Sequence, residues 1–118
     1  MRLETKKYLY DIQQAAAQIA EFTSGKQLED YRVNAMLRSA VERQFEIIGE
    51  ALAQLAKLDE QMAGRISERR RIVAFRNILI HGYADIDDRL VWDIVQAKLP
   101  VLRREVEALL GETSADTR

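Results

Sequence analysis

The segment from Arg76 to Tyr83 contains residue types that are suited to cleaving a phosphodiester. Its sequence is RNILIHGY, and it holds the only histidine among the 118 residues of the chain. An imidazole titrates near neutral pH, a guanidinium matches the geometry of a phosphate, and a tyrosine offers a hydroxyl. Arg76, His81 and Tyr83 therefore predict proton transfer and anion binding within one short segment.

Helical geometry determines which of these side chains share a face. At about 100° per residue, Arg76 lies at the edge of the apolar stripe of its own helix. His81 lies about 140° from Arg76 and only about 40° from Asn77, so Asn77 and His81 share a face. Gly82 is a natural helix terminator, and we therefore expect His81 at the C-cap. A turn of the chain there permits the imidazole to approach Arg76 without guaranteeing it.

One chain supplies only one histidine, whereas RNA cleavage by the 2′-hydroxyl requires a base, an acid and positive charge near the phosphate. Two chains paired across a twofold axis beside the segment would place two copies of each motif residue in one cleft: Arg76, Asn77, His81 and Tyr83. A nearby run of arginines predicts contacts to flanking RNA phosphates: Arg65, Arg69, Arg70 and Arg71. The sequence thus favours a homodimer that acts on RNA.

The composition predicts an all-α fold, because the chain has one proline, five glycines and long stretches of helix-forming residues. Apolar residues recur at helical spacing over residues 3–22, from about residue 28 for about 30 residues (about 45 Å if continuous), over 68–80, and from residue 88 onward. A short helix or an irregular connection is expected after Leu58. Asp87 is expected to cap the last helix, and Pro100 to kink it near residues 96–99. The short connections favour an antiparallel bundle of four to five helices.

The second of these helical segments has a single interior glycine, Gly49. Helix propensity alone disfavours glycine there, so Gly49 predicts the close approach of another helix. Glu46 and Glu50 on either side are interpreted as structural residues that orient arginines across the bundle.

Length and charge limit the possible functions. A chain of 118 residues predicts a single domain over residues 1–112 with a polar C-terminal tail over 113–118. Its 18 basic and 19 acidic residues give a net charge of −1, so any RNA binding must be local. The absence of cysteine and the single histidine argue against a zinc site, and we expect no metal and no cofactor. The chain has no apolar run long enough to span a bilayer, and a cytoplasmic protein is expected.

These residues resemble the HEPN domains and, among them, the HepT-like RNase toxins of HepT/MntA toxin–antitoxin systems. The defining pattern is an arginine followed after four to six residues by a histidine, here Arg76 and His81. Tyr83, two positions later, gives the Arg-x4-His-x-Tyr form of that toxin branch. The stretch ERQFEIIGEAL (residues 42–52) resembles the long second helix of the family, and YADIDDRLVWDIV (residues 83–95) resembles the start of its last helix, which usually also carries a proline, here Pro100. The stretch ISERRRIV (residues 66–73) departs from the proline and tryptophan of many relatives.

The resemblance implies a metal-independent endoribonuclease toxin that acts as a homodimer, with Arg76 and His81 as the catalytic pair and Asn77 in support. It also implies a cognate MNT-type nucleotidyltransferase antitoxin, which adds AMP to the motif tyrosine, here Tyr83. A non-catalytic module that binds a nucleotide or scaffolds a nucleotidyltransferase is the alternative function. A purely structural helical dimer is the third.

Each motif residue also has a structural interpretation. His81 is suited to capping a helix C-terminus, and Arg76 to an ion pair or an interface. Asn77 is suited to a helix-surface amide, and Tyr83 to packing at the edge of the bundle. The arginine run is also typical of a solvated face, partly neutralised by Glu68. Trp92 is expected in the core or at an interface.

Overall fold

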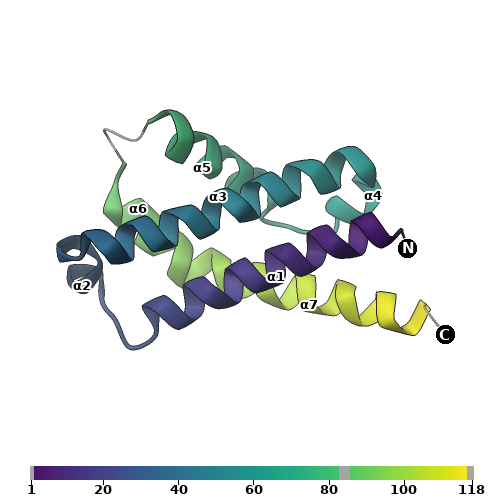
Figure 1. The fold of residues 1–118 in the computed structure, drawn as a ribbon, viewed down its shortest axis with the longest axis horizontal. Coiled ribbons are helices and arrows are strands. Elements are labelled where there is room, and N and C mark those ends of the chain that lie inside the picture. Colours follow the sequence, from purple (N-terminus) through teal and green to yellow (C-terminus); the bar gives the residue numbers. More distant parts are fainter. Residues whose placement is uncertain (1, 83–85, 117–118) are drawn as a thin grey trace.

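The computed structural model describes the backbone of residues 2–82 and 86–116, and the side chains of these residues as far as Glu112. Four long helices form the body: α1 (Leu3–Thr23), α3 (Ala35–Leu58), α5 (Arg69–His81) and α7 (Leu99–Asp116) (Figure 1). Shorter elements connect them: α2 (Leu28–Val33), α4 (Glu60–Ala63), α6 (Asp88–Asp93) and a π-helical stretch, η2 (Ile94–Lys98). No strand occurs in the described part of the chain, and the predicted all-α class is confirmed.

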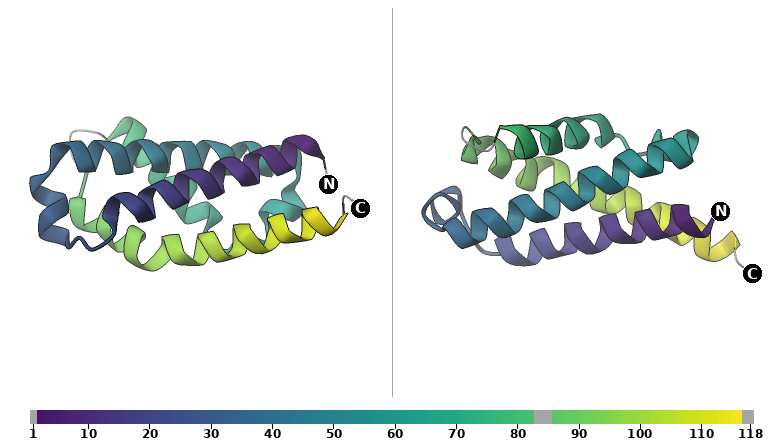
Figure 2. Two further views of the ribbon diagram at one scale, coloured as in Figure 1. Left: turned by 60° about the horizontal axis from the view of Figure 1, so that its bottom comes forward. Right: turned by 45° about the horizontal axis from the view of Figure 1, so that its top comes forward.

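Helix α3 is the central element of the bundle. It packs against α1 on one side and α5 on the other, and α1 also packs against α7. Figure 2 shows α3 between α5 and α1, with the two ends of the described chain at the same end of the molecule. The molecule is elongated, with extents of 48 × 29 × 20 Å.

The core is built from the apolar faces that the helical periodicity predicts. Most residues of these faces are buried, whereas Tyr8 and Phe22 are partly buried. The buried ones include Ile12, Ala15, Ile19, Val41, Phe45, Ile48, Leu52, Ile72, Phe75, Leu79, Val91, Leu102 and Val106. Phe45 of α3 meets Phe75 of α5 edge to face, with ring centroids 5.2 Å apart. Trp92 is a core residue and packs against Tyr31 at 5.6 Å. No helix among the described residues has the length and apolarity needed to cross a membrane.

The second predicted helical segment is not continuous, so it does not form a single element of about 45 Å. The backbone leaves the helical conformation at Asn34, where φ is −117° and ψ is 97°. The Asn34 side chain accepts a hydrogen bond from the backbone N–H of Leu37 at 3.0 Å and thereby starts α3 anew. Asparagine favours such local side-chain bonds over a continued helix, which is why apolar periodicity alone did not reveal the break.

The last helix begins as predicted, because the Asp87 carboxylate accepts hydrogen bonds from the N–H groups of Arg89 and Leu90. Before Pro100, the chain forms the π-helical stretch η2 instead of a simple kink. Proline donates no hydrogen bond and its ring crowds the carbonyl four residues earlier, and a wider turn accommodates both effects. Helix α7 continues to Asp116, so residues 113–116 of the predicted tail are helical in backbone.

Candidate functional site

Arg76 is positioned by the amphipathic character of α5. Ile72, Phe75 and Leu79 bury one face of this helix in the core. Arg76 lies at the edge of that face, and its side chain is only 25% exposed. The predicted position at the edge of the apolar stripe is confirmed.

The stem of Arg76 crosses α3 directly over Gly49. A Cβ atom built on Gly49 would lie 2.4 Å from the Arg76 Cβ and 2.6 Å from its Cγ. Only a residue without a side chain leaves room for this crossing. The predicted close approach is therefore confirmed, and the approaching helix is α5.

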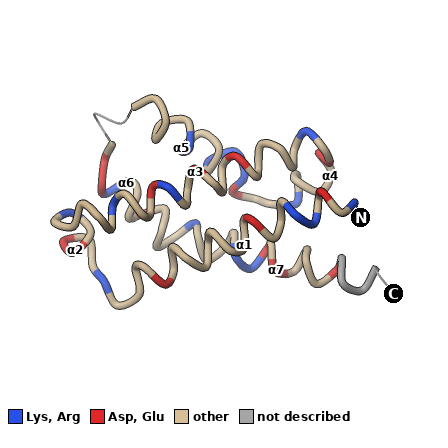
Figure 3. Tube along the Cα trace, in the orientation of Figure 1, with Lys and Arg blue, Asp and Glu red and all other residues tan. Residues whose placement is uncertain are grey.

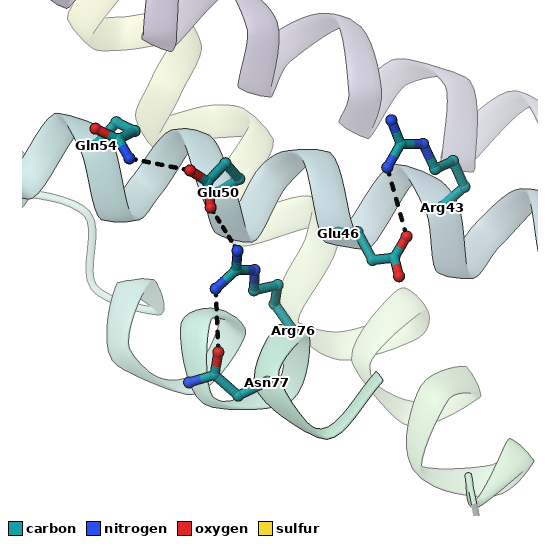
Figure 4. A network of polar contacts seen from close by, with 6 residues as sticks. All are labelled: Arg43, Glu46, Glu50, Gln54, Arg76 and Asn77. Carbon is teal, nitrogen blue, oxygen red and sulfur yellow. Dashed lines mark hydrogen bonds and ion pairs between the residues drawn. The ribbon is translucent and has the colours of Figure 1, made fainter. Parts of the chain in front are cut away.

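The charged end of Arg76 is held by a chain of polar contacts (Figure 4). Its Nη2 donates to Glu50 Oε2 at 2.5 Å, and its Nη1 donates to Asn77 Oδ1 at 3.1 Å. The other oxygen of Glu50 accepts from Gln54 Nε2 at 3.0 Å. The Nε of Arg76 is buried and has no hydrogen-bond partner among the described residues. The predicted role of Glu50 in orienting an arginine across the bundle is thus confirmed.

His81 is the last residue of α5 and is exposed to solvent. The C-cap is Gly82, one residue later than predicted, and its N–H donates to the carbonyl of Ile78 at 2.7 Å. The His81 imidazole forms no hydrogen bond or ion pair with any residue that the structure describes. Because α5 stays helical through His81, the imidazole emerges about 140° from Arg76. A single chain therefore does not bring the two side chains together, and Tyr83 lies outside the described residues.

Three of the four arginines that were predicted to contact RNA phosphates form ion pairs. Arg65 forms a two-pronged contact with Glu112, at 3.0 Å and 2.5 Å. Arg69 pairs with Glu60 at 2.9 Å, and Arg71 lies 3.8 Å from Glu68. The arginines lower the pKa of the carboxyl groups of Glu60 and Glu112. Among these four arginines, only Arg70 has no ion pair with a described residue. The predicted partial neutralisation of the arginine charge by Glu68 is confirmed.

A cleft of about 410 Å³ opens over α3 between α1 and α5 and includes Arg76. We call it the Arg76 cleft. Its lining comes from three helices: Lys7, Tyr8 and Asp11 of α1, Arg43, Glu46, Ile47, Glu50 and Ala51 of α3, and Arg76 and Ile80 of α5. Asn77 lines a second hollow of about 380 Å³, together with Arg69 and Arg70. Arg76 and Asn77 therefore line different hollows, although a hydrogen bond joins their side chains.

The sequence interpretation missed Lys7, Tyr8 and Arg43 as candidate site residues. Arg43, Glu46 and Glu50 are spaced at i, i+3 and i+7, so they share one face of α3, and this spacing was a usable signal. For Lys7 and Tyr8 no local signal existed, because their place in the cleft depends on the packing of α1 against α3.

The α3 face next to the cleft continues to Glu42, one turn before Glu46. Burial raises the pKa of the Glu42 carboxyl, Asp88 of α6 raises it further, and Arg38 opposes the shift. Negative charge is therefore costly at this end of α3, close to the start of α6.

Comparison with known proteins adds independent information. A family model described as "Ribonuclease HepT-like" matches residues 12–109. The chain is 38% identical over 104 residues to "Putative RNase MJ1380" of Methanocaldococcus jannaschii, covering 88% of this chain and 94% of that protein. It is 34% identical over 109 residues to "Probable ribonuclease HepT" of Thermococcus cleftensis, covering 92% of this chain and 98% of that protein.

A two-function relative also matches. The chain is 32% identical over 112 residues to "Gamma-glutamylcyclotransferase and putative RNase MJ0434" of M. jannaschii, covering 95% of this chain and 50% of that protein. No solved structure is similar enough to match the chain.

Proposed function

The chain belongs to the HepT-like ribonuclease family, and we propose that it is a metal-independent endoribonuclease that cleaves RNA in a cleft between two protomers. The observation that carries the proposal is the contrast between the two motif residues. Arg76 is held rigidly by Glu50 and Asn77, whereas His81 is exposed at the end of the same helix. A fixed cation and an accessible imidazole are what phosphodiester cleavage requires.

Two protomers are needed because one imidazole cannot be base and acid in the same step. In the proposed reaction, His81 of one protomer removes the proton of the 2′-hydroxyl, whose oxygen attacks the phosphorus. The bond from phosphorus to the 5′-oxygen breaks, and His81 of the second protomer protonates that oxygen. Arg76 stabilises the charge on the phosphorane-like transition state. The products are a 2′,3′-cyclic phosphate and a 5′-hydroxyl.

Replacement of the imidazole tests this mechanism. We expect His81→Ala to lower the rate of RNA cleavage by about 10²–10⁴-fold, because general acid–base catalysis contributes about this much. The wild-type protein should leave 2′,3′-cyclic phosphate ends with a metal chelator present. Arg104→Ala, a change at an exposed arginine of α7, is the control and should keep the wild-type rate. A His81→Ala protein that cleaves at the wild-type rate would remove this histidine from the mechanism.

The family resemblance extends the proposal to a toxin and its antitoxin. A cognate MNT-type nucleotidyltransferase would transfer AMP to Tyr83: the phenolic oxygen attacks the α-phosphorus of ATP, and pyrophosphate leaves. Tyr83 follows His81 by two residues, so AMP there would add bulk and negative charge next to the motif. Cleavage would be blocked because the added phosphate competes for the positive charge of Arg76.

The intact mass of the protein tests this modification. After coexpression with a candidate nucleotidyltransferase, we expect the mass to rise by one or more AMP units. Tyr83→Phe should abolish the increment, because phenylalanine has no hydroxyl to accept AMP. Tyr10→Phe is the matched control, since Tyr10 is an exposed tyrosine of α1, and this variant should keep the increment. An increment that persists in Tyr83→Phe would place the modification elsewhere.

The second candidate function is a non-catalytic module that binds a nucleotide or scaffolds a nucleotidyltransferase. It is favoured by one observation, namely that both terminal nitrogens of Arg76 already donate to acceptors of the protein. The two candidates differ in product chemistry, because a binding module would retain RNA without generating cyclic phosphate ends.

A further inference from the structure

The Arg76 cleft is large enough to hold a ligand of nucleotide size. Its volume of about 410 Å³ falls within the range of about 300–1,000 Å³ that is typical of small-molecule sites. Residues of three helices line it, and its apolar part comes from Ile47, Ala51 and Ile80. Because Arg76 belongs to the same cleft, a ligand bound there would lie beside the proposed catalytic arginine.

The cations of the cleft are available at its mouth. The side chains of Lys7 and Arg43 are 66% and 69% exposed. Each lies near a carboxylate of its own helix, Lys7 at 3.2 Å from Asp11 and Arg43 at 3.6 Å from Glu46. Exposed pairs of this kind contribute little to stability, so a phosphate can recruit both cations at low cost.

The carboxylates of the cleft are not all engaged to the same extent. Both oxygens of Glu50 accept hydrogen bonds, from Arg76 and from Gln54. In contrast, Glu46 Oε2 lies 3.6 Å from Arg43 Nη1, and Asp11 Oδ2 accepts a hydrogen bond from Lys7 Nζ at 3.2 Å. The other oxygen of each of these two carboxylates accepts no hydrogen bond from a described residue. Figure 4 shows Glu46 on the same side of α3 as the Glu50–Arg76 contact.

The cleft contains three carboxylates and three cationic side chains, so its lining is not suited to binding phosphate alone. A nucleotide offers the complementary set of groups, because its phosphates attract cations and the amino group of its base donates to carboxylates. Tyr8 adds a half-buried aromatic ring to the lining, and aromatic rings stack on unpaired RNA bases.

We propose that the Arg76 cleft binds the base of a nucleotide next to the scissile phosphate and selects cytosine, adenine or guanine over uracil. Glu46 and Asp11 accept hydrogen bonds from the exocyclic amino group, Tyr8 stacks on the base, and Lys7 and Arg43 contact the flanking phosphates. Uracil has no amino group, and its carbonyl oxygens would face the carboxylates. The position beside a scissile phosphate rests on the proposed ribonuclease function, whereas the base preference does not.

Binding of uncleavable RNA to the wild-type protein tests the proposal. The probes are fluorescent 2′-O-methyl oligonucleotides, which lack the attacking hydroxyl: octauridylate, and the same oligomer with one central cytidine or adenosine. We expect the substituted oligomers to bind about tenfold more tightly, as one good carboxylate–amino contact implies. Equal affinity for all three oligomers would overturn the proposal.

Variants of the two carboxylates assign the preference to the cleft. Glu46→Ala should reduce the tenfold preference to about one, and Asp11→Ala on the neighbouring helix should reduce it as well. Glu107→Ala removes the same charge from an exposed position of α7 outside the cleft and should keep the preference. Circular dichroism checks that each variant is folded. A preference that survives both cleft variants would overturn the proposal.

The base preference is measured independently of RNA cleavage. If the wild-type protein shows no cleavage of ordinary RNA but keeps the base preference with the 2′-O-methyl probes, the proposed ribonuclease function fails and the base site stands. If cleavage is observed without any base preference, the reverse holds.

Discussion

Arg76 is fixed at both ends of its side chain. Its stem lies against the backbone of Gly49, where a Cβ atom would be 2.4 Å away, and its guanidinium donates to Glu50 and Asn77. The Glu50 side chain is 50% exposed, so its ion pair alone contributes little to stability. The steric fit over Gly49 therefore matters more for the position of Arg76 than the charge does.

Substitution of Gly49 tests this fit. Gly49→Ala should lower the free energy of unfolding by up to about 2.5 kcal/mol, because overpacking costs about 1–3 kcal/mol and helix propensity returns about 0.5–1 kcal/mol. Chemical denaturation measures the change. The contacting atom is the Cβ of Arg76, which cannot move without moving α5, so RNA cleavage should also fall.

Gly111→Ala is the matched control. Gly111 also lies in a helix, α7, and a Cβ atom added there has nothing within 4 Å. The same substitution should therefore stabilise the protein by about 0.5–1 kcal/mol through helix propensity alone. Similar stabilisation by both substitutions would show that Arg76 adjusts freely and that Gly49 has no positioning role.

At the level of elements, α5 presents its motif residues in different directions. Arg76 and Ile80 face the cleft over α3, whereas Asn77 faces the hollow that it shares with Arg70. The chain stays helical through His81. It therefore does not turn before His81, and the imidazole keeps the direction that the helix gives it. The helix can fix the positions of Arg76 and His81, but it cannot by itself bring both side chains to one phosphate.

The connection that leads into α5 is held against α7 by polar contacts. Arg65 pairs with Glu112 of α7, and the hydroxyl and N–H of Ser67 both donate to Glu105 of the same helix. Figure 3 shows basic and acidic residues interspersed along the helices, with no large uniform stretch of one sign. Arg65 and Ser67 therefore anchor this connection to α7, and a contribution of the arginines to RNA binding stays a prediction.

At the level of the whole molecule, the proposed mechanism requires that the two protomers complement each other. His81→Ala protein should be inactive as a homodimer. In a heterodimer of wild-type and His81→Ala protomers, the shared cleft keeps only one imidazole, so either the base or the acid is missing and the heterodimer should be inactive as well. After mild denaturation and joint refolding, an equimolar mixture should therefore cleave RNA about half as fast as the same amounts of the two proteins refolded separately.

Sedimentation and activity of the refolded mixture measure this loss. The control is each protein taken through the same refolding alone: the wild type should keep its activity, and His81→Ala should stay inactive. A protein that sediments only as a monomer, or heterodimers that cleave RNA at the wild-type rate, would contradict a shared active site.

The local features of this protein follow from its sequence alone. The helical class, the buried faces, the cap at Asp87, the close approach at Gly49 and the edge position of Arg76 were all predictable. These features depend on residues three or four positions apart, or on the conformational demands of one residue type, and both are visible in a linear pattern. Membership of the ribonuclease family was likewise predictable, from the spacing of Arg76, His81 and Tyr83 together with the resemblance of residues 42–52 and 83–95 to the family.

Only the tertiary structure decided which charges are engaged and which side chains form the cleft. The Arg65–Glu112 and Arg76–Glu50 pairs join residues 47 and 26 positions apart, and Lys7 and Tyr8 reach the cleft only because α1 packs beside α3. Such contacts are set by the packing of whole helices, which local periodicity does not encode. The break at Asn34 and the wide turn before Pro100 were resolved in the same way, since each is one of several backbone solutions that the local sequence permits and the packed bundle selects.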